Sequence, residues 1–156
     1  QIDLPITAFI PGDWITNPDE KINAYRSATQ CDSNNSLIQL SLIQLASDWV
    51  DRYGTLPNAV ESLIEVMKLK IIAKKCGFSR IKLSKPNIEL ETFMDEPAFK
   101  MLLKGLGHHL HSRFIYKKGS RNSSVTIRGV GVLDSDKLLD QLTEWLEIMS
   151  SEINCK

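Results

Sequence analysis

Apolar residues recur at helical spacing in three consecutive stretches of the first half of the chain. They are Ile22 and Tyr25 in the first stretch, Leu37, Leu40, Leu45 and Trp49 in the second, and Val60, Leu63, Met67 and Ile71 in the third. This period predicts three amphipathic helices. Asn17 and Pro18 favour the start of the first, and Pro57 the start of the third. Gly54 and Gly77 favour left-handed ends for the second and the third.

Apolar and polar residues alternate elsewhere in the chain, which predicts strands. Residues 4–15 alternate between two prolines and indicate a short edge strand. Residues 80–83 and 88–91 indicate one hairpin, and residues 109–116 and 124–130 a second. Asp95 and Pro97 favour a helix between the hairpins, and a last amphipathic helix carries Leu138, Leu142, Trp145 and Met149 after a cap near Asp134 or Ser135.

This order predicts an α+β fold with an N-terminal edge strand, a three-helix segment, two β-hairpins separated by a helix, and a C-terminal helix. The 156 residues match the size of one domain and contain no internal repeat or long linker. We expect a single domain over residues 1–156, with a strand and lead-in at 1–16, a helical part at 17–77 and a mixed α/β part at 78–156. Because residue 1 is Gln and the first Met is Met67, we expect a piece of a longer polypeptide.

Composition argues against some functional classes for this chain. Nineteen basic and nineteen acidic residues give no net charge, so bulk charge does not support general binding to nucleic acid or membranes. No apolar run approaches the ~20 residues of a membrane span. Cys31, Cys76 and Cys155 are widely spaced and odd in number, which favours reduced thiols and a cytoplasmic location.

Charge is nevertheless unevenly distributed along the chain. Residues 1–67 hold three basic and nine acidic residues, whereas residues 68–85 hold seven basic residues and no acid. The basic stretch is either a solvated face that complements a helix dipole or a docking surface. Nucleic-acid binding stays open, although the stretch lacks interleaved aromatic residues. The candidate docking residues are Lys68, Lys70, Lys74, Lys75, Arg80 and Lys82.

Two acids, Asp48 and Asp51, stand three residues apart on the second predicted helix, so their carboxylates share a face. Such a pair either performs acid–base chemistry, or faces solvent, or faces a partner. Acids near a helix C-terminus oppose the dipole and cost about 0.3–1 kcal/mol. A partner that needs these charges would account for their position.

The sequence lacks the motifs of common catalytic and nucleotide sites. It has no phosphate-binding loop, no dinucleotide-binding glycine pattern and no nucleophile elbow, so we predict no enzymatic activity and no cofactor for this chain. His108, His109 and His111 are clustered, and His109 and His111 share one face of a predicted strand. Their spacing matches no common zinc signature, so we predict a solvated strand rather than a metal site.

Three segments resemble one protein family. AFIPGDWI at residues 8–15, DWVDRYGTLPNAV at 48–60 and MKLKIIAKKCGFSRI at 67–81 resemble the C-terminal domain of bacterial transcription-repair coupling factors, as do Lys21-Ile22 and Tyr25-Arg26 between the first two. Specific motifs cover the first half, and the second half agrees in length and element order.

The resemblance implies a regulatory, non-catalytic domain of a larger ATP-dependent DNA translocase that removes stalled RNA polymerase and recruits UvrA for nucleotide excision repair. It implies that the domain contacts the UvrB-like module of the same chain through Asp48 and Asp51 and masks its UvrA-binding face. ATP and magnesium then belong to the parent motor, and UvrA, RNA polymerase and DNA are partners through the parent. The alternative is a nucleic-acid- or polymerase-binding module that uses the basic stretch.

Overall fold

The computed structural model describes residues 2–4, 7–30, 38–84, 86–130 and 133–154. The chain forms two compact units, one of Ile6–Ile71 and one of Gln1–Pro5 with Ile72–Lys156. The boundary falls inside helix α3 (Asn58–Cys76). Helices combined with a mainly antiparallel sheet confirm the predicted α+β class. That residues 1–156 act as one domain stays a prediction.

The helices of the first unit begin and end where the sequence predicts. Helix α1 spans Pro18–Gln30 and helix α2 spans Ile38–Tyr53. The Asn17 side chain accepts hydrogen bonds from the backbone N–H of Asp19 at 2.9 Å and of Glu20 at 3.2 Å, which confirms it as the cap of α1. Gly54 and Gly77 have φ angles of 91° and 93°, so both helix ends need the left-handed backbone that glycine adopts without strain. The polar turn predicted at residues 31–36 lies outside the described residues.

The edge strand predicted within residues 4–15 is wrong. The described residues of this segment form no strand, and strand β1 is the preceding pair Ile2–Asp3. The Phe9 N–H donates to the Ala59 carbonyl at 3.3 Å, and the Ile10 N–H donates to the Tyr25 hydroxyl at 2.8 Å. These bonds tie the segment to helices α3 and α1. The alternation therefore reflects side chains that anchor an irregular segment on helices, not one face of a sheet.

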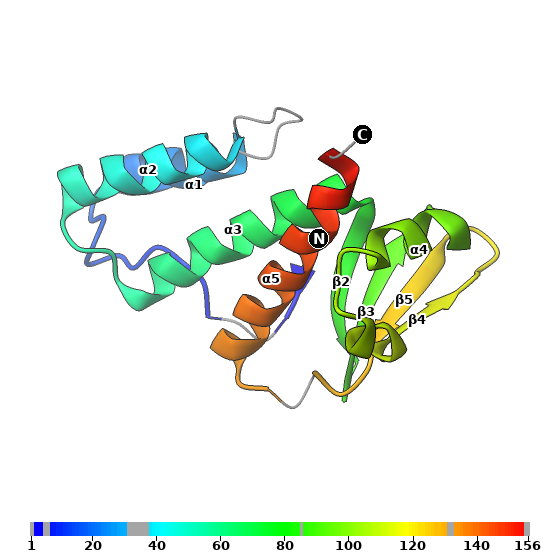
Figure 1. Ribbon diagram of the computed structural model, residues 1–156. Helices are drawn as coiled ribbons and strands as arrows, with labels where there is room; N and C mark the ends of the chain where they lie inside the picture. The colour runs from blue at the N-terminus through cyan, green and yellow to red at the C-terminus, as the bar shows by residue number, and fades with distance from the viewer. Residues whose placement is uncertain (1, 5–6, 31–37, 85, 131–132, 155–156) are drawn as a thin grey trace. The chain divides into compact units, whose positions relative to one another are not determined.

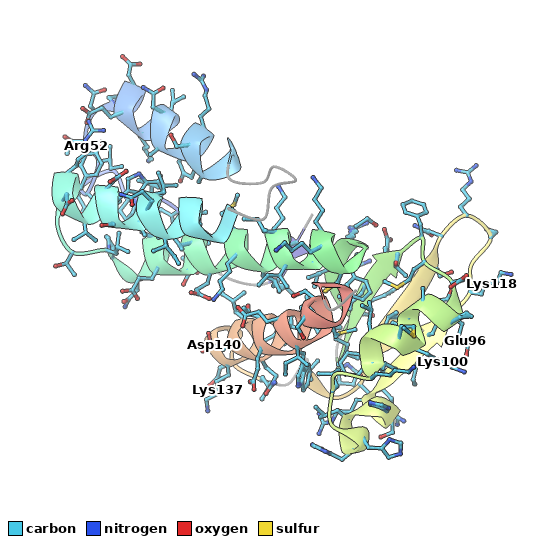
Figure 2. All side chains as sticks on the ribbon, turned by 45° about the horizontal axis from the view of Figure 1, so that its top comes forward. Arg52, Glu96, Lys100, Lys118, Lys137 and Asp140 are labelled. Atoms are coloured by element: carbon cyan, nitrogen blue, oxygen red, sulfur yellow. The ribbon has the colours of Figure 1, made fainter. Side chains whose placement is uncertain are left out.

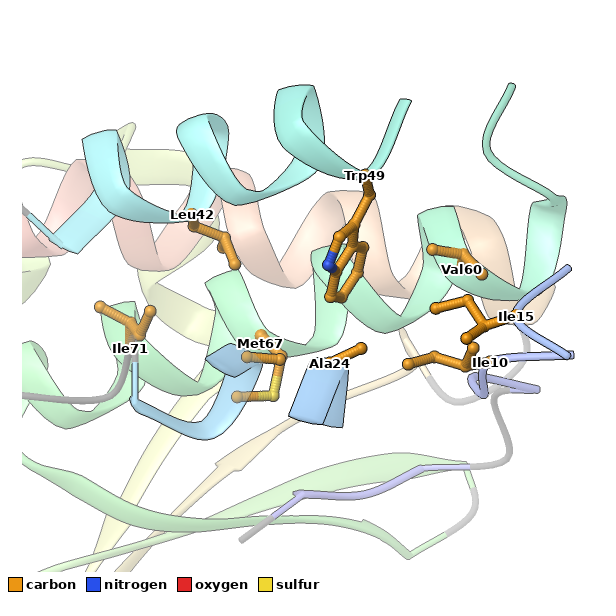
Figure 3. Packing of buried hydrophobic residues seen from close by; sticks show 9 residues of the cluster. Ile10, Ile15, Ala24, Leu42, Trp49, Val60, Met67 and Ile71 are labelled. Carbon is orange, nitrogen blue, oxygen red and sulfur yellow. The ribbon is translucent and has the colours of Figure 1, made fainter. Parts of the chain in front are cut away.

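The core of the first unit joins that segment to all three helices (Figure 3). Trp49 extends from α2 into this cluster and is 4% exposed. A buried tryptophan removes a large apolar area from water and dominates the packing around it. The buried members of the cluster are Ile10, Ile15, Ala24, Ala28, Leu42, Trp49, Val60, Met67 and Ile71.

The second unit contains one sheet of five strands in the order β1-β2-β3-β5-β4. The remaining strands are β2 (Phe78–Ser84), β3 (Asn87–Thr92), β4 (Phe114–Lys117) and β5 (Ser123–Ile127). β1 pairs with β2 in parallel, and the other pairs are antiparallel. The register aligns Ile81, Leu90, Val125 and Tyr116 across four strands, and the first three of these side chains are fully buried. One face of the sheet is therefore the core face.

Helices α4 (Glu96–Leu103) and α5 (Ser135–Asn154) complete this unit, and Figure 1 shows α4 along the sheet. Asp95 caps α4 as predicted, because its carboxylate accepts from the Ala98 N–H at 2.9 Å. Phe114 on β4 contacts Phe99 of α4 and Trp145 of α5, with ring centroids 6.5 and 5.6 Å apart. In the described part of the chain, no helix is long and apolar enough to cross a membrane.

The second predicted hairpin is correct in its pairing but not in its limits, since β5 ends at Ile127 rather than at residue 130. Residues 108–113 form a 3₁₀-helix, η1 (His108–Arg113), and β4 begins only at Phe114. The Leu110 N–H donates to the Gly107 carbonyl at 2.9 Å, and the Phe114 N–H donates to the His111 carbonyl. Local turn bonds therefore replace the strand bonds that the alternation predicts for these residues.

Candidate functional site

A groove with a volume of about 250 Å³ lies between α1 and α2 in the first unit. Its residues recur every three or four positions on each helix, so each helix presents one face to it. The lining residues are Glu20, Asn23, Ala24 and Ser27 on α1, and Leu45, Asp48, Trp49, Arg52 and Tyr53 on α2. The groove is therefore polar and acidic at its edges and aromatic beneath.

Aromatic rings support the groove from below. Trp14 packs edge-on against Trp49 with ring centroids 6.1 Å apart, and lies 5.4 Å from the ring of Tyr53. The indole Nε1 of Trp14 is buried and has no hydrogen-bond partner in the described part of the structure. Edge-to-face packing of this kind adds to the stability that burial supplies. The cluster fixes where α2 places its polar side chains.

A polar network links the two rims of the groove. Arg52 Nη2 lies 3.7 Å from Glu20 Oε1, and the Tyr53 hydroxyl donates to Glu20 Oε2 at 3.4 Å. The Arg52 guanidinium also lies 5.4 Å from the centre of the Tyr53 ring. Figure 2 shows Arg52 at the end of α2 beside α1. The Arg52 and Glu20 side chains are 64% and 45% exposed, so water screens this ion pair.

The structure places the two predicted acids differently. Asp48 lines the groove and accepts a hydrogen bond from Gln44 Nε2 at 3.0 Å. Asp51 is exposed outside the groove, and its carboxylate has no hydrogen bond or ion pair with any other described residue. The two carboxylates still lie on one side of α2, since three residues correspond to 60° around a helix axis. One acid is thus held within the domain, and the other is available to a partner.

Sequence analysis missed Glu20 as a third acid of this site. Its position in the first turn of α1 suggests only a favourable interaction with the helix dipole. Its role at the groove depends on α1 lying beside α2, and the sequence gives no direct sign of that pairing. The pair Glu20 and Arg52, separated by 32 residues, is visible only in the folded chain.

The basic stretch is divided between the two units. Lys68 and Lys70 are half-buried on the part of α3 that belongs to the first unit. Lys74 and Lys75 are exposed in the last turn of α3, where they complement the dipole. The stretch is therefore not a single patch of one unit.

The remaining two basic candidates lie on β2 in the second unit. Arg80 stands opposite Glu91 on β3, and Lys82 stands opposite Glu89. Opposite charges directly across a strand pair stabilise the sheet. This register places a glutamate directly across the strand pair from each cation.

The histidines do not share a strand face as predicted, because residues 108–113 are helical. The rings of His108 and His111 instead contact each other, with centroids 5.1 Å apart. No group of three or more potential metal ligands occurs among the described residues.

Of the cysteines, Cys76 is buried, and burial raises the pKa of its thiol to about 12. The thiol donates to the Leu146 carbonyl at 3.3 Å. A protonated, buried thiol is a poor nucleophile. Cys31 and Cys155 lie outside the described residues.

Comparisons with known proteins agree on one family. The TRCF domain model matches residues 4–101. A transcription-repair-coupling factor of Staphylococcus haemolyticus is 27% identical over 90 residues, which cover 58% of this chain and 7% of that protein. The factor of Staphylococcus aureus strain USA300 is 22% identical over 162 residues, which cover 99% of this chain and 12% of that protein. This chain thus spans a small part of these relatives.

The fold has a solved counterpart. A crystal structure described as the C-terminal domain of a transcription-repair coupling factor superposes with a TM-score of 0.80 and 18% sequence identity. The superposition covers 100% of this chain and 94% of that one. The likeness therefore includes the second half, where the sequence motifs are least specific.

Proposed function

Because the chain belongs to the TRCF domain family, we propose that it is a regulatory, non-catalytic domain of a transcription-repair coupling factor. In this proposal the parent is an ATP-dependent DNA translocase that removes stalled RNA polymerase and recruits UvrA. The domain binds the UvrB-like module of the same chain and masks its UvrA-binding face. Asp48 and Asp51 supply the contact, and the masked state is autoinhibited.

The outer face of α2 is the observation that carries this proposal. Ile43 and Val50, seven residues apart and therefore on one side of the helix, are 66% and 43% exposed. Asp51 is exposed and follows Val50 about 100° around the helix, whereas Asp48 lies about 160° from Val50, at the edge of the groove. Apolar side chains bordered by polar ones are typical of protein interfaces. The carboxylates favour a partner surface that is basic, which gives the docking its specificity.

The same face suits a contact that must open. An exposed ion pair contributes about 0.2–1 kcal/mol, so two carboxylates and a small apolar stripe hold the domain weakly. A weak contact is useful here, because a change of only a few kcal/mol then shifts the population between masked and unmasked states. Asp51 opposes the dipole of α2 in the free domain, and a basic partner removes that penalty.

The test measures the affinity of the full-length parent for UvrA. Asp51→Lys replaces attraction to a basic surface by repulsion, so we expect UvrA to bind the variant more tightly than the wild type. Asp140→Lys is the matched control, because Asp140 is an exposed aspartate on a helix of the other unit (Figure 2). Unchanged UvrA affinity in a folded Asp51→Lys variant contradicts the proposal.

A second experiment removes the whole domain from the parent. Tighter UvrA binding after this truncation supports a mask, and equal or weaker binding contradicts it. In that event the next hypothesis is that the basic stretch binds nucleic acid or RNA polymerase. Its signature is DNA binding that weakens steeply with salt, because phosphate contacts release counterions.

A further inference from the structure

All three histidines of the chain occur in one short segment that the proposed function does not use. They belong to the 3₁₀-helix η1 (His108–Arg113) of the second unit. Residues three apart eclipse each other on a 3₁₀-helix, because it has three residues per turn. His108 and His111 therefore lie one above the other, with ring centroids 5.1 Å apart and ring planes at 59°. The His109 ring lies against Gly107.

A backbone carbonyl fixes the orientation of His111. Its Nε2 lies 3.1 Å from the carbonyl oxygen of Leu106, a residue that is only 4% exposed. A carbonyl oxygen can only accept, so Nε2 is the donor, and in the neutral ring the lone pair is on Nδ1. Histidines that bind metals commonly donate their other ring N–H to a carbonyl in this way, which sets the tautomer and the ring direction.

We propose that His108 and His111 form a two-imidazole binding site for a divalent transition-metal ion of the nickel, copper and zinc class. The ring spacing suits one shared ion. Imidazole nitrogens bind such metals at about 2.0–2.1 Å, so two rings at a tetrahedral angle have centroids roughly 5 Å apart. His111 binds through Nδ1. Water completes the coordination, since the described residues bring no third protein ligand to the pair.

The backbone around the pair favours binding, because little of it needs to be reordered. The Leu110 N–H donates to the Gly107 carbonyl at 2.9 Å, and the N–H of Phe114, the first residue of β4, donates to the His111 carbonyl. The helix is thus tied to the sheet immediately after the second ligand. His108 is exposed and His111 is half-buried, so an ion reaches the pair from solvent. Imidazole nitrogens are good ligands for nickel, copper and zinc, so we expect the site to prefer these metals.

The test titrates the intact, untagged chain with NiCl₂ at pH 7.5 by isothermal titration calorimetry. Cys31→Ser and Cys155→Ser are present throughout, so that other thiols do not compete for nickel. We expect one nickel ion per chain. His108→Gln and His111→Gln each weaken nickel binding by at least about tenfold. Replacing a residue that only hydrogen-bonds to a metal ligand already lowers affinity by this much. Binding also weakens on acidification, because protons compete with the metal for imidazole.

His109→Gln is the matched control, since it removes the third histidine of the same helix but not a ligand. It keeps the wild-type nickel affinity if the pair is the site. Three results would each overturn the proposal. The wild type fails to bind nickel, the folded His108→Gln variant binds nickel as the wild type does, or His109→Gln loses as much affinity as His108→Gln. His108→Gln is the decisive variant, because its exposed ring makes its replacement least disruptive to folding.

Discussion

Two charged regions of this protein, the acidic face of α2 and the basic strand β2, differ in where their charges find partners. On β2, Arg80 and Lys82 stand opposite Glu91 and Glu89 of the neighbouring strand. On α2, Asp51 has no ion pair among the described residues. The sequence makes the basic region look more prominent, because residues 68–85, which include β2, hold seven cations and no acid.

The difference shows that a run of like charge along a chain is not by itself an interaction surface. A sheet brings together residues that are distant in sequence, and its register decides whether opposite charges meet. A helix surface shows only its own residues and those of the helix beside it. The acidic face of α2 therefore keeps an exposed charge for a partner, whereas β2 places its cations opposite glutamates of the neighbouring strand.

The largest expected effect comes from removing the support of α2. Trp49→Ala deletes a side chain that is 4% exposed, and we expect a loss of about 3–5 kcal/mol in the free energy of unfolding. Val50→Ala, at the adjacent and 43% exposed position, is the control and changes stability by less than about 0.5 kcal/mol. Urea unfolding of both variants measures the difference. Similar losses at the two positions contradict the packing of α2.

A second prediction concerns pH and the buried thiol of the sheet-containing unit. Burial raises the pKa of Cys76 from 9.0 to about 12 in the folded chain. The unfolded state therefore loses the proton first, and the free energy of unfolding decreases as the pH rises from 9.0 toward 12. Cys76→Ala lacks this titration, so its stability depends less on pH over that range. Parallel pH profiles of the two proteins would contradict the prediction.

The pairing on β2 can be broken from the opposite strand. Glu91→Lys places like charges directly across β2 and β3 at Arg80, and we expect stability to decrease by about 1 kcal/mol or less. Glu91→Gln removes the attraction without adding repulsion and has a smaller effect. Thermal unfolding at low and high salt measures both, because salt screens the charges. An equal effect of the two substitutions argues against a role for the pair.

The smallest expected change in the free energy of unfolding comes from removing a charge on α2. Asp51→Asn removes an unpaired acid from the last turn of the helix, so we expect a gain of about 0.3 kcal/mol in the free energy of unfolding. A loss of stability would mean that Asp51 has a partner within the domain. Asp19→Asn gives the opposite sign, because Asp19 lies in the first turn of α1, where the dipole favours an acid. Unfolding in urea compares the two variants.

Local chemistry explains which elements could be predicted from the sequence. The caps Asn17 and Asp95 and the helix ends at Gly54 and Gly77 follow from side-chain size and hydrogen bonding over a few residues. Alternation misled in an irregular segment that buries Ile10 between more exposed neighbours, and in a 3₁₀-helix that buries none of its residues. Ile10 and His111 are examples, since a turn or a helical anchor can imitate the period of a strand.

The sequence by itself determined the helices, their caps, the hairpin of β2 and β3, and the acids of α2, because these depend on neighbours within a few residues. Only the tertiary structure decided that Glu20 joins Asp48 at one groove, that glutamates stand opposite Arg80 and Lys82, and that the Asp51 carboxylate keeps no partner among the described residues. These outcomes depend on helix pairing and strand register. Both are set by burial of apolar side chains across long sequence separations, which no local pattern records.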